Sequence, residues 1–311
     1  MSYKYKFTIL TPCYNSEKFI HRVYDSLINQ TFKDFEWIVI NDGSIDKTSQ
    51  IINGYIDENK IDIKFIDNKD NRGLLAVTKI GVHEALGELI VMIGHDDKIT
   101  NNALEILNNE WNKFSDNEKE TLIGISYPCM DQHGNSVGKN KIDTKVYDLV
   151  EMVFSEKFIY ETGGAINSYF WKKYNYFDEN IDKFIPGLIP FYNAFETEGL
   201  FKYRCYYLDN PLRIYYRFEG ESLSSLPMIK YSKGFEYEAL RVLNSFGSYL
   251  LKNNFKRYVK YMIKYIVNAC LNSTNIYKQY VGLTSFYNKI FYILFLLLGW
   301  SYFLKIKKRK L

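Results

Sequence analysis

The sequence predicts an α/β fold, in which a mostly parallel sheet is flanked by helices and followed by a helical C-terminal extension. Two observations support the α/β part. From residue 7 to about residue 107, short apolar runs alternate with helical patterns, which is typical of successive βαβ units. Residues 89–93 are apolar on both faces, as expected for a central strand that helices cover on both sides. A helical pattern from about residue 231 indicates the extension.

The elements follow from local patterns. Ser16 is a suitable N-cap for a helix whose apolar residues recur at helical spacing until residue 29. Further helices are expected at 46–52, 75–86 and 102–111. The expected strands, in chain order, are residues 7–10, 35–40, 61–65, 88–93 and 122–127. Residues 145–225 indicate a mixed region.

Composition narrows the class of protein. With 47% hydrophobic and 24% charged residues among 311, the chain is globular with a substantial core. A net charge of +4 is too small to indicate nucleic-acid binding by itself. The four cysteines stand far apart without a Cys-x-x-Cys pair, which favours neither a zinc site nor a disulfide framework and fits a reducing cytosol. The polar N-terminus runs directly into a strand, so we expect no secretory signal.

Three polar turns follow predicted strands, at residues 11–15, 41–44 and 94–97. Ligands bind at the carboxyl ends of the strands in an open parallel sheet, so these turns are the first candidates for a site. Asp42 could accept a hydrogen bond from a base or a ribose, and Tyr14 could lie against the base. By itself, Asp42 is better explained as an ordinary turn residue.

Asp96 and Asp97 form a carboxylate pair directly after a strand. Like charges this close repel each other unless a cation or a proton compensates. Mg²⁺ or Mn²⁺ would compensate, because such cations bind one or two carboxylates together with phosphate oxygens. The alternative is that both residues only cap the helix expected near residue 101.

Arg72 and Gly73 place a cation and a flexible backbone where a diphosphate could lie at a helix N-terminus. The chain has neither a Gly-x-Gly-x-x-Gly motif at this position nor a Walker-type Gly-Lys-Ser/Thr motif. Dinucleotide-binding and ATP-hydrolysing classes are therefore disfavoured.

Taken together and in this order, these motifs resemble those of the family 2 glycosyltransferases, which are inverting enzymes of the GT-A fold. The closely matching stretches are residues 8–15, 30–36, 38–48, 71–73 and 85–88, leading to Asp96-Asp97. Residues 160–225 match more loosely, through Gly163-Gly164 and residues 211–217 and 222–224.

The resemblance implies roles for particular residues. It implies metal coordination by Asp96, with Asp97 second, and an acceptor side shaped by Gly163 and Gly164. Arg217 and the segment around Ser222 resemble a loop that closes over the diphosphate. The donor contacts carried over are Thr11, Pro12, Tyr14, Asn15, Asp42, Arg72, Gly73, Asp96 and Arg217.

Two departures from the family pattern affect the site. Gly94 stands where the family usually has an acid. The acid that serves as catalytic base is also missing from its expected place near Tyr192. Glu196, about one helical turn later on the same face, is the nearest substitute, and Glu198 is the second candidate. The alternative for both glutamates is an ordinary solvated helix face.

The expected domains are a GT-A catalytic domain at residues 1–225 and a helical region at 226–311. Within the first, residues 1–110 form the nucleotide-sugar-binding half and 111–225 the acceptor half. Residues 290–304 are almost wholly apolar and precede a basic cluster. This run is shorter than the roughly 20 residues needed to cross a bilayer, so it predicts an interfacial or partly inserted helix attracted to anionic lipid. A helix docked on the protein is the alternative.

The expected activity is transfer of a hexose or related sugar, with inversion, from a nucleoside-diphosphate sugar to an acceptor hydroxyl. The expected donor is a UDP-sugar, and the expected acceptor is a surface polysaccharide or a lipid-linked glycan. We expect Mg²⁺ or Mn²⁺ as cofactor, no nucleic-acid partner, and a peripheral location on the cytoplasmic face of the cell membrane.

Gly94 and the missing acid leave one alternative open, a non-catalytic relative that binds sugar nucleotide or partner enzymes. A nucleotidyltransferase would need a loop containing Gly and Lys after the first strand. Residues 11–16 contain neither.

Overall fold

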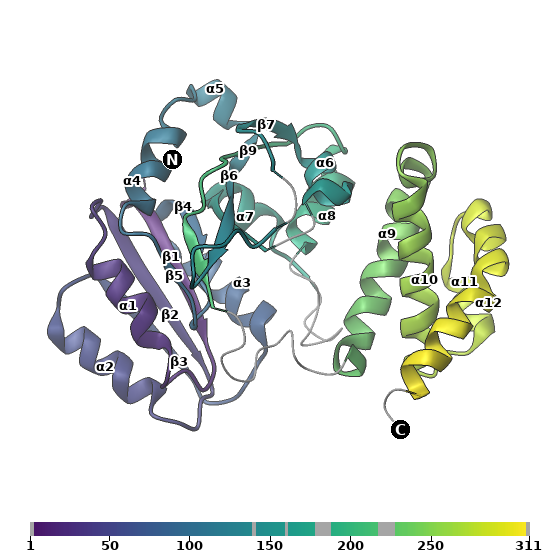
Figure 1. Ribbon diagram of the computed structural model, residues 1–311, viewed down its shortest axis with the longest axis horizontal. Coiled ribbons are helices and arrows are strands. Elements are labelled where there is room, and N and C mark those ends of the chain that lie inside the picture. Colours follow the sequence, from purple (N-terminus) through teal and green to yellow (C-terminus); the bar gives the residue numbers. More distant parts are fainter. Residues whose placement is uncertain (1–2, 139–140, 159–160, 178–187, 217–227, 309–311) are drawn as a thin grey trace. The chain divides into compact units, whose positions relative to one another are not determined.

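The structure is a computed structural model that describes residues 3–138, 141–158, 161–177, 188–216 and 228–308. The chain forms two compact units (Figure 1). The first contains Met1–Met152, Lys157–Tyr176 and Asn193–Glu219. The second contains Val153–Glu156, Phe177–Tyr192 and Gly220–Leu311, so part of the expected acceptor half groups with the C-terminal helices.

The first unit is built on a sheet in which β1 (Tyr5–Cys13) pairs in parallel with β2 (Phe35–Asp42) and β4 (Gly87–Met92). Strand β3 (Ile63–Asn68) pairs in parallel with β2, which gives the order β3-β2-β1-β4. The carboxyl ends of these four strands lie at one edge of the sheet, as the sequence predicts. The α/β fold with a mostly parallel sheet is thereby confirmed.

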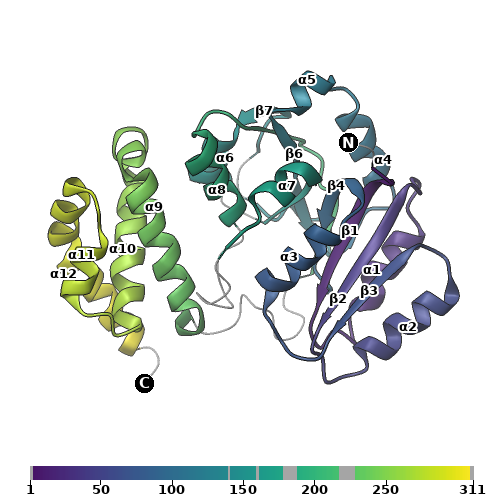
Figure 2. The same cartoon turned by 180° about the vertical axis from the view of Figure 1, so that it is seen from behind.

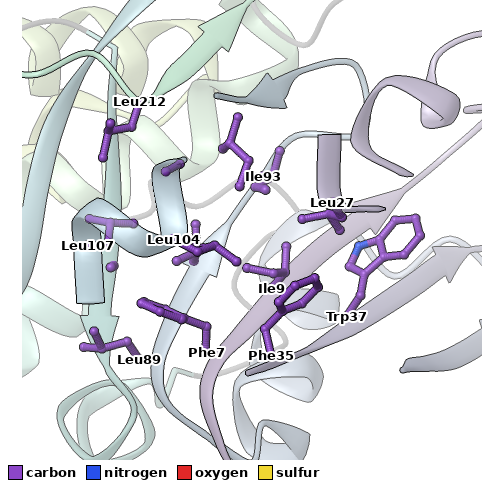
Figure 3. Packing of buried hydrophobic residues seen from close by; sticks show 14 of the residues in the cluster. Phe7, Ile9, Leu27, Phe35, Trp37, Leu89, Ile93, Leu104, Leu107 and Leu212 are labelled. Carbon is purple, nitrogen blue, oxygen red and sulfur yellow. The ribbon is translucent and has the colours of Figure 1, made fainter. Parts of the chain in front are cut away.

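Helices cover both faces of this sheet because apolar residues alternate between the two sides of each strand. On one face, Phe7 and Ile9 of β1 pack with Leu27 of α1 (Ile20–Ile28) and Leu104 of α4 (Ala103–Trp111) (Figure 3). Helix α2 (Thr48–Glu58) adds Ile52 to the same cluster. On the other face, Leu10 and Ile38 pack with Val77 and Val82 of α3 (Leu74–Glu84).

An antiparallel extension continues the sheet beyond β4. Strand β8 (Thr162–Asn167) runs antiparallel to both β4 and β6 (Leu122–Asp131). Strand β10 (Arg213–Tyr215) joins β6 in parallel and β5 (Lys98–Ile99) antiparallel. The remaining elements between residues 113 and 208 are α5 (Asp116–Lys119), β7 (Lys145–Asp148), α6 (Leu149–Phe154), a 3-10 turn (Glu156–Phe158), α7 (Ser168–Tyr174), α8 (Ile189–Glu198) and β9 (Arg204–Tyr207).

The second unit contains four C-terminal helices, preceded by a 3-10 turn at Met228–Tyr231. They are α9 (Ser232–Asn253), α10 (Phe255–Leu271), α11 (Ile276–Gly282) and α12 (Phe286–Lys308). Helix α10 lies between α9 and α12 (Figure 2). Buried polar groups tie the helices together: the Tyr258 hydroxyl donates to Asn288 Oδ1 at 2.9 Å, and Asn288 Nδ2 donates to the Leu243 carbonyl at 2.7 Å.

The last helix is longer than the apolar run of residues 290–304. Phe286–Ile306 forms a continuous apolar helix of 21 residues, which is long and apolar enough to cross a membrane by length and composition alone. The expectation that the run is too short to span therefore does not hold. The helix is longer because aromatic and polar residues before residue 290 belong to the same helix.

Candidate functional site

The turns after β1 and β2 are bound to each other. The Asn15 N–H donates to Ser44 Oγ at 2.8 Å, and the Ile45 N–H donates to Asn15 Oδ1 at 3.1 Å. Asn15 adopts a left-handed backbone with φ 51°, which asparagine tolerates better than most residues. Tyr14 is 47% exposed beside it. These contacts hold an exposed aromatic ring at the carboxyl end of the central strand.

Asp42 at the end of β2 fixes the start of α3. Its two carboxylate oxygens accept from the Arg72 and Gly73 N–H groups, both at 2.8 Å. Gly73 has φ 91°, a backbone that glycine adopts without strain. Asp42 is buried, so its observed role is to place the α3 N-terminus, with Arg72 before it, at this edge of the sheet.

Thr11 and Pro12 lie in the interior, and neither presents a side chain to solvent. Thr11 Oγ1 accepts from Trp37 Nε1 at 2.9 Å. Among the donor contacts predicted in this turn, Tyr14 and Asn15 are the exposed ones. A donor contact from Thr11 or Pro12 would therefore come from the backbone.

Asp97 is committed to a buried ion pair. Its side chain has no exposed surface, and Oδ2 accepts from Arg213 Nε at 2.9 Å and from Arg213 Nη2. The Tyr216 N–H donates to Asp97 Oδ1 at 3.1 Å. Burial raises the pKa of Asp97, and the positive charge of Arg213 opposes that rise. Both carboxylate oxygens of Asp97 thus accept hydrogen bonds, which join the turn to β10 and the residue after it. Of the two neighbouring acids, Asp96 is the one whose carboxylate is open to a cation.

Asp96 lies next to this pair and is partly exposed. Within the described ranges, no hydrogen bond or ion pair reaches its carboxylate, whereas its backbone carbonyl accepts from Arg22 Nη1 at 3.1 Å. A Cβ at Gly94 would lie 2.9 Å from Asp96 Oδ1 and 3.1 Å from Asp97 Oδ2. The glycine that departs from the family pattern therefore gives both carboxylates room.

His95 presents a buried nitrogen in the same turn. In the described part of the chain, Nδ1 has no hydrogen-bond partner. Burial lowers the pKa of His95, and the negative charges of Asp96 and Asp46 only partly offset this effect. The neutral imidazole is therefore favoured. No three His, Cys, Asp or Glu side chains gather as a metal site among the described residues. Asp96 with His95 fits a Mg²⁺ or Mn²⁺ ion that takes its other ligands from phosphate and water.

The two glycines on the predicted acceptor side lie in β8. A Cβ at Gly163 would lie 2.1 Å from the Tyr127 ring, so this glycine is required by the packing of a buried tyrosine. A Cβ at Gly164 would meet the Ile125 carbonyl at 3.5 Å, which is an ordinary contact. Their observed role is packing, and contact with an acceptor stays a prediction.

The two candidate bases differ in their surroundings. Glu198 accepts from Lys173 Nζ at 2.7 Å, Lys202 Nζ at 2.5 Å and the Tyr174 hydroxyl at 2.8 Å. The bonds from Lys173 and then Lys202 lower its pKa to about 2. A carboxylate so strongly stabilised in its ionised form is a poor proton acceptor. Glu196 is exposed near the end of α8, and its catalytic role stays a prediction.

Several expected contacts lie elsewhere. Tyr192, near which the family pattern predicts the base, is buried in the second unit, where its hydroxyl donates to Glu238 at 2.9 Å. Arg217 and Ser222 lie outside the described residues.

The structure adds residues to the site that no sequence motif marks. Arg213 Nη1 also lies 3.4 Å from Glu161 Oε1. Beside the turn, the Arg22 guanidinium lies 3.9 Å from the centre of the Tyr216 ring. Arg22 and Tyr216 both border a pocket of about 460 Å³, lined by α1, β5 and β10. No local motif marks these residues, because they meet only through contacts distant in sequence.

Residues 8–141 match the family described as Glycosyl transferase family 2. An uncharacterised glycosyltransferase of Rickettsia typhi is 31% identical over 183 residues, which are 56% of this chain and 54% of that protein. Glycosyltransferase GlyA of Streptococcus pneumoniae serotype 4 is 30% identical over 161 residues, which are 50% of this chain and 22% of that protein. The chain thus matches about half the length, or less, of these curated relatives.

Two solved structures share the fold. Residues 1–349 of S. aureus TarS, solved with UDP-GlcNAc, superpose with a TM-score of 0.58 and 18% identity, over 86% of this chain and 83% of that one. A mannosyltransferase from Pyrobaculum calidifontis, solved with GDP-Man and Mn²⁺, gives a TM-score of 0.51 and 13% identity, over 98% and 85% of the two chains. The fold is of the GT-A type. Over its residues 8–141, this chain resembles glycosyl transferase family 2.

Proposed function

We propose that this chain transfers a sugar, with inversion, from a nucleoside-diphosphate sugar to the hydroxyl of a surface polysaccharide or lipid-linked glycan. A UDP-sugar is the proposed donor. One observation carries the proposal: the open Asp96 carboxylate lies in the turn that follows β4, at the same edge of the sheet as the linked turns after β1 and β2. The match of residues 8–141 to the family 2 model and the likeness to TarS, which was solved with UDP-GlcNAc, support it.

Each strand end has a part in donor binding. The exposed Tyr14 ring offers a face for the base, and Asn15 shapes the turn that presents it. Asp42 holds the start of α3 so that the helix N-terminus and Arg72 face the diphosphate. A helix N-terminus attracts anions because its first N–H groups lack partners within the helix.

Asp96 and His95 would hold Mg²⁺ or Mn²⁺ at this edge, with phosphate oxygens completing the ligand set. When bound, the ion supplies positive charge that stabilises the departing diphosphate. The Asp97–Arg213 pair holds the turn that carries both ligands.

Transfer also needs a base. It accepts the proton of the acceptor hydroxyl while the acceptor oxygen attacks the anomeric carbon from the face opposite the diphosphate. A single displacement of this kind inverts the anomeric configuration.

The test is a panel of nucleotide sugars incubated with the purified chain, Mn²⁺ and glycan acceptors, with diphosphate release and product anomer measured. Metal-dependent release with an inverted product is expected. Binding of UDP-sugar, seen as thermal stabilisation, without release or transfer for any donor would favour the non-catalytic alternative.

We further propose that α12 brings the chain to the cytoplasmic face of the cell membrane. Its exposed apolar side chains include Leu294 at 66% and Leu297 at 81% exposure. In sequence, a basic cluster follows at residues 305–310, and such clusters attract anionic lipid headgroups. An acceptor linked to lipid would then lie within reach of the enzyme.

A further inference from the structure

We propose that Glu161, at the start of β8, is the base that accepts the proton of the acceptor hydroxyl. This inference rests on the proposed transfer activity and names a residue for the role that the family pattern leaves vacant. It replaces Glu196 as the leading candidate.

Strand register places Glu161 at the edge of the sheet that carries the candidate site. Strand β8 runs antiparallel to β4, with Val91 opposite Ala165 and Ile90 opposite Ile166. Glu161 directly precedes Thr162, the first residue of β8. The start of β8 therefore meets the end of β4, where the turn with Asp96 begins.

A side-chain contact supports this placement. Arg213 binds Asp97 through Nε and Nη2, and its Nη1 lies 3.4 Å from Glu161 Oε1. One buried guanidinium thus joins Glu161 to the turn that carries the proposed metal ligands. Glu161, Arg213 and Asp97 come from three segments that are far apart in sequence.

Exposure distinguishes the two acids that share this arginine. The Asp97 side chain has no exposed surface, whereas that of Glu161 is 43% exposed. The 3.4 Å contact is long for a charge-assisted hydrogen bond. Arg213 can therefore orient Glu161 while its oxygens remain accessible to an acceptor hydroxyl.

The proposed step is balanced. A Glu161 oxygen accepts the hydroxyl proton, and the acceptor oxygen forms the new bond to the anomeric carbon. The bond between that carbon and the diphosphate oxygen breaks, and its electron pair leaves with the nucleoside diphosphate. Glu161 later returns the proton to solvent.

The test compares Glu161→Gln with Glu161→Asp and with the matched controls Glu196→Gln and Glu198→Gln, after a donor and acceptor have been found for the wild type. Removing a general base typically costs about 100-fold or more in rate. We expect that loss of kcat in Glu161→Gln, with the donor KM and thermal stability unchanged, and partial activity in Glu161→Asp. The acid limb of the wild-type kcat–pH curve should disappear in Glu161→Gln.

Two results would overturn the assignment: wild-type kcat in Glu161→Gln, or loss of kcat in Glu196→Gln with Glu161→Gln still active. If Glu161→Gln folds poorly, Glu161→Asp keeps the carboxylate on a shorter stem, and wild-type kcat with an unchanged pH curve in that variant counts against the proposal. An inactive wild type with every donor is a different result, because it removes the proposed function itself.

Discussion

At the scale of single residues, the neighbouring acids Asp96 and Asp97 have opposite surroundings. Asp97 is buried against Arg213, whereas no described side chain binds the Asp96 carboxylate. A buried charge is tolerated only when it is paired, and an exposed one remains available to a ligand. The pair therefore separates into one carboxylate held in a structural ion pair and one that no described side chain binds.

Asp96→Asn should keep the fold but lose metal-dependent turnover. Because it removes a charge that would hold the cation, we expect a loss of about 100-fold or more in donor turnover with Mn²⁺ and an unchanged Tm. Steady-state kinetics and thermal unfolding measure the two effects. Wild-type turnover in this variant would refute Asp96 as metal ligand.

Asp97→Asn is the matched contrast. It leaves the buried Arg213 charge with only the long 3.4 Å contact to Glu161, so the free energy of unfolding should fall by about 3 kcal/mol.

Glu198 leads to a pH prediction. Lys173 and Lys202 lower its folded pKa to about 2 from the ordinary 4.5. A carboxyl pKa that is lower in the folded than in the unfolded chain stabilises the fold at pH values above the unfolded pKa. That contribution is lost as the pH falls through 4.5 toward about 2. Acid unfolding, followed by tryptophan fluorescence, should begin at higher pH in Glu198→Gln than in wild type. Identical acid-unfolding curves would show that these ion pairs add nothing to the stability of the fold.

At the scale of elements, α3 begins where Asp42 binds the Arg72 and Gly73 N–H groups. This contact joins the end of β2 to a helix that starts 32 positions later, at Leu74. Side-chain acceptors at helix starts compensate N–H groups that have no partner within the helix.

Asp42→Asn should weaken both α3 and donor binding. An amide retains one acceptor oxygen, so one of the two N–H groups loses its partner, and we expect a loss of about 1 kcal/mol in the free energy of unfolding. UDP affinity should fall as well, because the helix start that faces the diphosphate is less well fixed. Denaturant unfolding and UDP titration measure the changes, with the exposed Asp70→Asn as control. Unchanged UDP affinity would show that the donor does not depend on this helix start.

At the scale of the whole molecule, α12 has two sides with different roles. Asn288 and Tyr292 are buried and bonded to neighbouring helices, whereas Leu294 and Leu297 are largely exposed. A chain ended near Leu283 would lose both sides, so a fold defect and a membrane defect could not be separated. Substitutions on the exposed side avoid that ambiguity.

The double variant Leu294→Lys/Leu297→Lys should lose membrane binding while keeping its Tm. Apolar burial in lipid would be replaced by the cost of burying two charges, whereas in water both side chains already face solvent. Vesicle flotation should recover wild type with anionic vesicles and more weakly with zwitterionic ones. If the variant floats as wild type does, or if wild type fails to float, the proposed membrane contact is wrong.

The sequence by itself determined the existence of the first four strands, the polar turns that end three of them and the resemblance to family 2 glycosyltransferases. These features depend on apolar periodicity and turn chemistry within short segments, so they can be predicted locally. It also pointed to Asp96 and Asp42, because both directly follow strands.

Only the tertiary structure decided what those side chains contact. Asp97 and Arg213 are 116 residues apart in the chain, and Glu161 joins them through a strand register that no local pattern specifies. Helix α12 likewise begins at Phe286, before the apolar run, and Asn288 in this added part is buried. Partners of this kind depend on which faces pack together, and that choice is made by the whole core rather than by any one segment.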